Sequence, residues 1–105
     1  MLCPSQACTQ VAGGFTSIMD LAFGPDGTLY VVEFDEDSWL AVVGGGFAPS
    51  AGGTVNACNV STGSCSELAT GLSLPTAVTV DRNGTVWIAE HAPVLFASAK
   101  VRPLP

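Results

Sequence analysis

The stretch Phe23-Gly-Pro-Asp-Gly-Thr-Leu-Tyr-Val-Val-Glu33 decides the fold, because it recurs downstream as Val80-Asp-Arg-Asn-Gly-Thr-Val-Trp-Ile-Ala-Glu90. Each copy consists of an extended run, a tight turn at Asp26-Gly27 or Asn83-Gly84, and a second extended run. An Asp-Gly or Asn-Gly pair between two β-rich runs is the strongest short-range signal for a β-hairpin. The sequence therefore predicts two equivalent hairpins.

The two copies are related by a constant offset of 57 residues (84 − 27 = 57), which holds without a gap as far as Glu33 and Glu90. Most matched positions keep their character, whereas Asp20 is matched by Ala77. Two unrelated hairpins are the alternative, but gapless self-similarity of this length is typical of a repeat protein.

Further extended runs complete a unit of four strands. Residues 14–70 are expected to form one complete unit, residues 7–13 the last strand of a preceding unit, and residues 71–105 an incomplete following unit. The expected strands are Met19–Phe23, Thr28–Phe34, Thr54–Val60, Ser64–Thr70, Thr76–Asp81, Thr85–Glu90 and Ala99–Arg102, with Gly44–Gly53 as an inserted loop.

Both faces of the expected strands are apolar. Leu29 and Val31 point to one face, while Tyr30 and Val32 point to the other. A sheet with one face in water would alternate apolar and polar residues, whereas a sheet between two neighbouring sheets is apolar on both sides. Units of four antiparallel strands stacked in this way are the blades of a β-propeller. The predicted fold class is all-β, a β-propeller segment of about two four-stranded antiparallel blades that do not make a complete propeller.

Composition limits the partners. The 105 residues are 48% hydrophobic and 11% charged, which argues against disorder. The net charge of −6 disfavours nucleic acid and anionic lipid. No run reaches the ~18 apolar residues of a membrane span, so no membrane partner is expected. Residues 1–5 lack the basic and apolar regions of a signal peptide, so none is expected in this chain.

The four cysteines can form two disulfide bonds. Cys8 and Cys65 are separated by the same 57 residues as the repeat, and each lies with another cysteine beside a hairpin tip. We expect disulfides Cys3–Cys8 and Cys58–Cys65, because directly opposed strand positions are close enough to bridge. A zinc site with four thiolates is the alternative, although the pairs lack knuckle spacing at both ends. Disulfides would place the full-length parent in an extracellular or periplasmic compartment.

An acidic run supplies most of the candidate binding residues, which are Glu33, Asp35, Glu36 and Asp37. The run is interpreted either as a solvated loop or as a weak Ca²⁺ site at Asp35, Glu36 and Asp37, since carboxylate oxygens on a flexible loop suit that ion. The spacing of an EF-hand loop is missing. No cofactor other than this Ca²⁺ is expected.

Two further observations concern function. Asp20 lies on the expected innermost strand and has no acidic counterpart in the next unit. It is therefore either a binding residue or a carboxylate held by backbone donors. Glu33 recurs as Glu90, which favours a structural role, because a catalytic residue need occur only once. No catalytic residue is assigned. The sequence does not decide whether the protein is an enzyme, but it favours a non-enzymatic function.

Two motifs carry a family resemblance. The run Gly71-Leu-Ser-Leu-Pro75, with the Phe23 to Val31 hairpin, resembles NHL-type and SMP-30/gluconolactonase-like six-bladed propellers. Residues 15–33 and 68–76 resemble the ScyD/ScyE family more closely. The resemblance covers residues 10–91 and departs at Arg82-Asn83, where Pro-Asp is usual, and after Glu90.

The resemblance implies the C-terminal portion of an exported propeller, a non-enzymatic segment that recognises a ligand or partner across its face. Its expected partners are the remaining blades or copies of itself, and a small molecule or glycan. One alternative is part of a metal-dependent hydrolase of SMP-30 type, whose ligands would come from several blades. The other is a purely structural truncated fragment.

Overall fold

The computed structural model describes residues 10–35, 37, 43–44, 52–90 and 99–105. In this part of the chain seven strands form two antiparallel sheets, in the orders β1-β2-β3-β4 and β5-β6-β7. The strands are β1 (Ile18–Phe23), β2 (Leu29–Glu33), β3 (Gly53–Cys58), β4 (Cys65–Leu72), β5 (Pro75–Val80), β6 (Val86–Glu90) and β7 (Lys100–Pro103).

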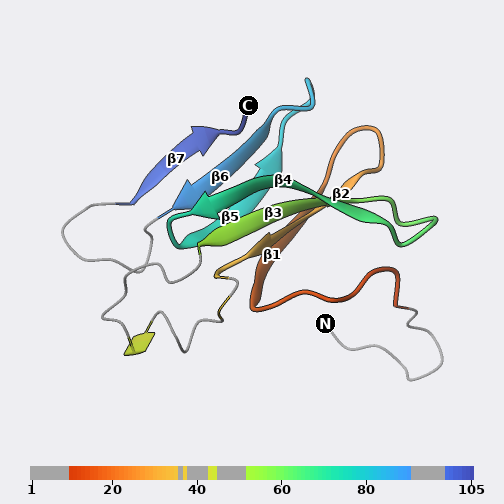
Figure 1. The fold of residues 1–105 in the computed structure, drawn as a ribbon. Coiled ribbons are helices and arrows are strands. Elements are labelled where there is room, and N and C mark those ends of the chain that lie inside the picture. The colour runs from red at the N-terminus through yellow and green to blue at the C-terminus, as the bar shows by residue number, and fades with distance from the viewer. Residues whose placement is uncertain (1–9, 36, 38–42, 45–51, 91–98) are drawn as a thin grey trace, which may run out of the picture.

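The predicted all-β fold class is confirmed. The first sheet is a four-stranded antiparallel blade, and the second has three strands in the described residues, with β7 at its free edge (Figure 1). The strand ends differ from the expected ends by at most two residues. The largest of these shifts involve β3 and β4, which pair with register irregularities.

The two hairpin turns have the same geometry. In the first, Gly24 N donates to Thr28 O and Gly27 N donates to Gly24 O; in the second, Asp81 and Gly84 make the equivalent bonds. Gly27 and Gly84 have φ angles of 87° and 85°, a left-handed conformation that glycine adopts without a steric penalty. The local turn chemistry therefore fixes the same strand pairing in both units.

The main core lies between the two sheets. It consists of buried apolar residues from β2 to β6 and from the C-terminal end of the described chain, namely Val32, Val55, Leu72, Val78, Val86, Ile88 and Leu104. Each of these side chains is less than a tenth exposed. Burial of one such side chain stabilises a protein by about 1.5–3 kcal/mol. The apolar side chains that β2 and β6 direct into this core therefore hold the two sheets together.

Residues 10–15, the described part of the expected opening strand and its junction, are not in a strand. They still contact the first sheet, because Ala12 and Phe15 pack against Leu29, Val31 and Cys58 on the face that points away from the second sheet. The inserted loop ends earlier than expected, since Gly53 is already the first residue of β3. Residues 45–51 of that loop lie outside the described residues.

Cys58 and Cys65 are directly opposed in the β3–β4 pair and form a disulfide, as predicted. The alternative of a zinc site built from all four thiolates is wrong, because these two sulfur atoms are bonded to each other. The predicted Cys3–Cys8 pair lies outside the described residues. Within the described ranges no helix has the length and apolar character needed to cross a membrane.

Candidate functional site

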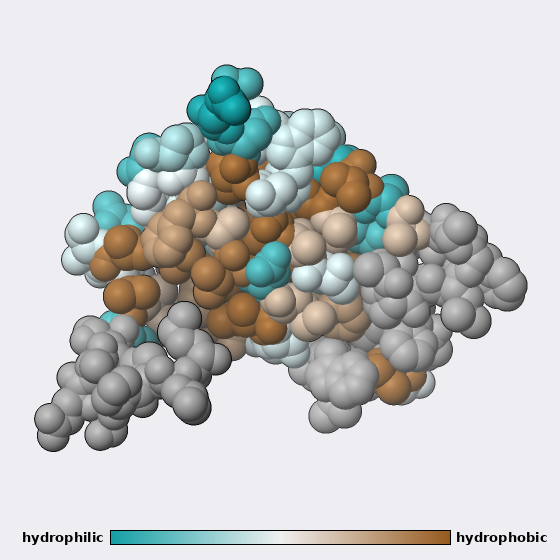
Figure 2. Space-filling view, turned by 180° about the vertical axis from the view of Figure 1, so that it is seen from behind, coloured by the Kyte–Doolittle hydropathy of each residue, from teal (hydrophilic) through white to brown (hydrophobic). Residues whose placement is uncertain are grey.

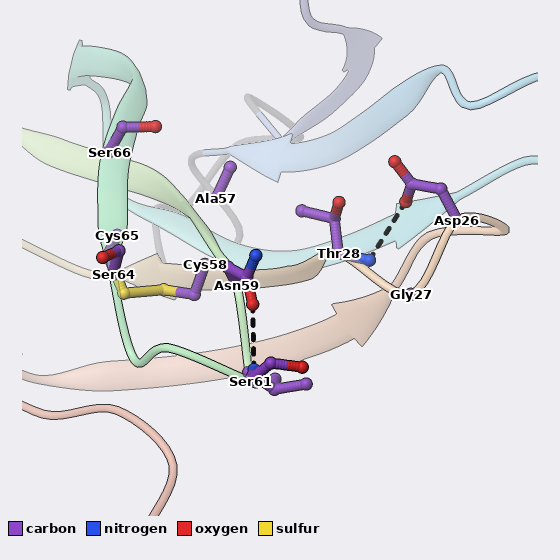
Figure 3. Close-up of a pocket in the computed structure, with 11 residues that line it drawn as sticks. Asp26, Gly27, Thr28, Ala57, Cys58, Asn59, Ser61, Ser64, Cys65 and Ser66 are labelled. Carbon is purple, nitrogen blue, oxygen red and sulfur yellow. Dashed lines mark hydrogen bonds between the residues drawn. A yellow bond between two sulfur atoms is a disulfide. The ribbon is translucent and has the colours of Figure 1, made fainter.

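A hollow of about 570 Å³ lies at the hairpin-tip end of the first sheet. Figure 3 shows the Asp26-Gly27 turn on one side of it and the Cys58–Cys65 disulfide on the other. Its lining is rich in hydroxyl and amide groups and consists of Asp26, Gly27, Thr28, Ala57, Cys58, Asn59, Val60, Ser61, Ser64, Cys65 and Ser66. Its volume is in the range of small-molecule sites, which is about 300–1,000 Å³.

The β3–β4 turn makes a fixed wall of this hollow. Asn59 Oδ1 accepts hydrogen bonds from Ser61 N at 2.9 Å and Thr62 N at 3.3 Å, which is the side-chain turn that asparagine favours. The backbone closes the same turn, because Asn59 N donates to Ser64 O at 2.8 Å. The disulfide beside these bonds ties the two strands together, so the backbone of the β3–β4 turn has a fixed conformation.

The opposite wall carries one negative charge. Asp26 Oδ1 accepts a hydrogen bond from Thr28 N at 3.0 Å (Figure 3). Hydrogen bonds from the backbone and then the side chain of Thr28 hold the pKa of Asp26 below its ordinary value. The carboxylate is therefore ionised at neutral pH, which favours a neutral or cationic ligand over an anionic one.

Glu33 lies at the other end of the blade. Strand β2 separates it from the hollow by five residues, or about 16 Å. The side chain is buried and accepts from Thr16 N at 2.6 Å, Thr54 Oγ1 at 2.7 Å and Asn56 Nδ2 at 2.6 Å. These bonds join the segment that precedes β1 to β2 and β3, which is a structural function.

Glu90 repeats this arrangement in the second sheet. Its Oε2 accepts from Ser73 N at 2.9 Å, and Ser73 is the 57-residue counterpart of Thr16. Its Oε1 accepts from Arg102 Nε at 2.5 Å. Burial works to raise the pKa of Glu90, but the hydrogen bonds from Arg102 and Ser73 and the charge of Arg102 outweigh it, so the pKa lies below its ordinary value.

The remaining acidic candidates lie in the connection between β2 and β3. Asp35 is fully buried and accepts from Asp37 N at 2.9 Å and Gly52 N at 3.0 Å, so it joins the two ends of the connection. Asp37 is exposed, and Glu36 lies outside the described residues. In the part of the chain that the structure describes, no three His, Cys, Asp or Glu residues are grouped to hold a metal ion. Weak Ca²⁺ binding at Asp35, Glu36 and Asp37 stays a prediction.

Asp20 bridges the two sheets. Its Oδ2 accepts from Val78 N on β5 at 3.0 Å, and its Oδ1 accepts from the adjacent Leu21 N at 2.9 Å. Backbone donors thus hold the carboxylate, which was one of the two interpretations of this residue. The structure does not bring Asp20 together with Glu33 or Asp35 at one site, since each of the three carboxylates has separate partners.

Sequence reasoning missed the hollow and two polar contacts. One contact is the Glu90–Arg102 ion pair, and the other is the bond from Trp87 Nε1 to Asp81 Oδ2 at 3.1 Å. A signal for the hollow was present, because Ser61, Ser64 and Ser66 cluster around the predicted Cys58–Cys65 hairpin tip. These serines line a hollow because the fold brings the Asp26-Gly27 turn beside that hairpin tip.

Comparison with known proteins gave no assignment: no protein-family model matches the sequence, and no curated protein matches it significantly.

Proposed function

We propose that this chain is a non-enzymatic segment of an exported β-propeller of ScyD/ScyE or NHL type, and that it recognises a small neutral polar molecule, such as a sugar, in the hollow at the hairpin tips. The observation that carries the proposal is the lining of that hollow. Hydroxyl and amide groups of Thr28, Asn59, Ser64 and Ser66 surround it, together with the small apolar side chain of Ala57.

The engagement of the carboxylates supports a binding role over catalysis. Asp20, Glu33, Asp35 and Glu90 each accept at least one backbone hydrogen bond that joins separate segments of the fold. A general acid or base needs a proton-accepting oxygen in reach of the substrate. These four carboxylates instead hold loops and strands in place, and none of them is among the residues that line the hollow.

Charge and covalent structure support the ligand class and the compartment. The net charge of −6 and the ionised Asp26 at the rim disfavour phosphorylated or carboxylated ligands. The Cys58–Cys65 disulfide fits an oxidising compartment outside the cytosol.

The test is an NMR titration of the 105-residue chain with neutral mono- and disaccharides and with their phosphorylated counterparts. Shift changes are expected at Thr28, Asn59, Ser64 and Ser66 with the neutral sugars. Ser66→Tyr should abolish them by filling the hollow. Thr70→Tyr is the matched control, because Thr70 is exposed on the same strand and does not line the hollow.

Two results would overturn the proposal. The first is the absence of any response at the hollow across the sugar panel. The second is hydrolysis of a simple aldonolactone that a chelator abolishes, which would support the alternative of a metal-dependent hydrolase.

A further inference from the structure

The two faces of the first sheet are covered differently. The face toward the second sheet is closed by the main core, in which Val32 and Val55 are fully buried. On the opposite face, hereafter the outer face, Leu29 and Val31 are buried beneath Ala12 and Phe15. The outer face therefore has an apolar layer of its own above β2.

Strand β1 leaves the rest of this outer face open. Leu21 and Phe23 are the register partners of Val31 and Leu29, so all four side chains share that face. Leu21 is 52% exposed and Phe23 is 60% exposed, far more than is usual for large apolar residues in a strand. From behind, the described surface shows broad brown hydrophobic areas among the hydrophilic ones (Figure 2).

The repeat shows what covers the equivalent positions. The counterparts of Leu21 and Phe23 at the 57-residue offset are Val78 and Val80, which pack against the first sheet in the main core. The positions that β5 packs against a neighbouring sheet are therefore exposed on β1.

Residues 10–15 occupy one part of the place of such a neighbouring sheet. Ala12 and Phe15 are the counterparts of Ala69 and Leu72, the β4 residues that join the main core. Residues 10–15 therefore lie over the first sheet in the place that β4 takes over the second sheet. A complete neighbouring sheet would place strands equivalent to β1, β2 and β3 beside residues 10–15.

The second sheet has those three strands, and its outer face is partly exposed. Trp87 and Ala89 are the counterparts of Tyr30 and Val32, which face the neighbouring sheet in the first unit. They alternate with Val86 and Ile88 of the core and so point the other way. Val101, the register partner of Ala89, is 70% exposed.

We propose that the outer face of the second sheet packs on the outer face of the first sheet of another copy of this chain. The contact repeats the internal packing of the two sheets, in which β5 lies against β1 and β2, so that β5 and β6 of one copy face Leu21 and Phe23 of the next, with Val101 beside them on the same face. Residues 10–15 of the second copy then lie beside β7 of the first and occupy the place of its fourth strand.

The contact is head-to-tail, because the two faces that meet are different. A head-to-tail contact closes into a ring when the rotation between copies fits, and otherwise grows into a filament. The described residues form two sheets, so a ring with the usual 4–8 blades built from this 105-residue chain would contain about two to four copies. This assembly is separate from the hollow at the hairpin tips and does not depend on ligand binding.

Light scattering coupled to size-exclusion chromatography tests the proposal on the 105-residue chain. The wild type should form a defined oligomer. Leu21→Glu and Val101→Glu should each be monomeric with unchanged circular dichroism, because both side chains are exposed in the single chain. Leu68→Glu is the matched control, since Leu68 is 39% exposed but lies near Tyr30 and Leu104 at the rim between the two sheets.

Mixing the two monomeric variants gives the sharper result. The Leu21→Glu chain keeps an intact second-sheet face, and the Val101→Glu chain keeps an intact first-sheet face, so a 1:1 heterodimer should form and grow no further. A wild-type monomer at about 100 µM, a concentration at which a contact with a Kd of about 1 µM would be largely formed, would overturn the proposal. So would an oligomer that survives Leu21→Glu, or a mixture of the variants that stays monomeric.

Discussion

Asp20 on β1 accepts a hydrogen bond from Val78 N on β5 at 3.0 Å, across 58 residues of sequence. Val78 is also part of the main core, so the same residue joins the two sheets through its backbone and its side chain. The next unit has Ala77 at the position of Asp20 and lacks the acceptor needed for an equivalent bond. The contact is therefore a specific connection between the two sheets and not a general property of the repeat.

We expect Asp20→Ala to destabilise the chain by about 1 kcal/mol, the typical net value of one hydrogen bond. The local effect should be larger, because the Val78 amide loses its acceptor and should exchange with solvent faster. Urea unfolding and amide hydrogen exchange measure the two effects. Glu67→Ala, at an exposed position of β4, is the control and should change neither. An unaltered exchange rate at Val78 in Asp20→Ala would contradict the role of this bond.

Glu90 should make stability depend on pH. Its pKa in the folded chain lies below the ordinary value of 4.5. A carboxyl whose pKa is lowered by folding stabilises the folded state fully above its unfolded pKa, and this contribution is lost as pH falls through the folded pKa. The stability difference between wild type and Glu90→Gln should therefore shrink between pH 6 and pH 3, as measured by thermal unfolding across that range. A difference that is constant with pH would argue against the ion pair with Arg102.

The two turn glycines should be equally sensitive to substitution. Gly27→Ala and Gly84→Ala each place a Cβ atom at a left-handed backbone position, which costs roughly 1–2 kcal/mol. Gly44→Ala is the matched control, because Gly44 has no positive φ and an added Cβ would meet no atom within 4 Å. Urea denaturation of the three variants should give two similar losses and one unchanged midpoint. A tolerant Gly27→Ala variant would show that the turn can relax.

Replacing both Cys58 and Cys65 by serine should cost stability. The two cysteines are only seven positions apart in the sequence, so the loss should lie at the low end of the ~2–4 kcal/mol that disulfides contribute. Denaturation with and without a reductant measures it, and a Cys3 and Cys8 double serine variant measures the separate contribution of the other predicted pair. Peptide mapping under non-reducing conditions tests both predicted pairs, and a Cys3–Cys58 or Cys8–Cys65 peptide would refute the predicted pairing.

The sequence by itself determined the strands, their antiparallel order and one disulfide. Turns such as Asp26-Gly27 and Asn83-Gly84 depend on the conformational preferences of adjacent residues, which a sequence states directly. The 57-residue repeat then fixed which strands are equivalent. The Cys58–Cys65 pair was predictable for the same reason, since a short turn sets its two ends opposite each other.

The tertiary structure alone decided the roles of the carboxylates and the location of the hollow. Glu33 takes its backbone donor from Thr16, 17 residues earlier, and Asp35 takes one from Gly52, 17 residues later. The hollow needs the Asp26-Gly27 turn beside the Asn59 turn, and these turns are separated in the sequence by two strands and a long connection. Such contacts depend on where distant segments pack, because a carboxylate accepts any donor that the fold brings within about 3 Å.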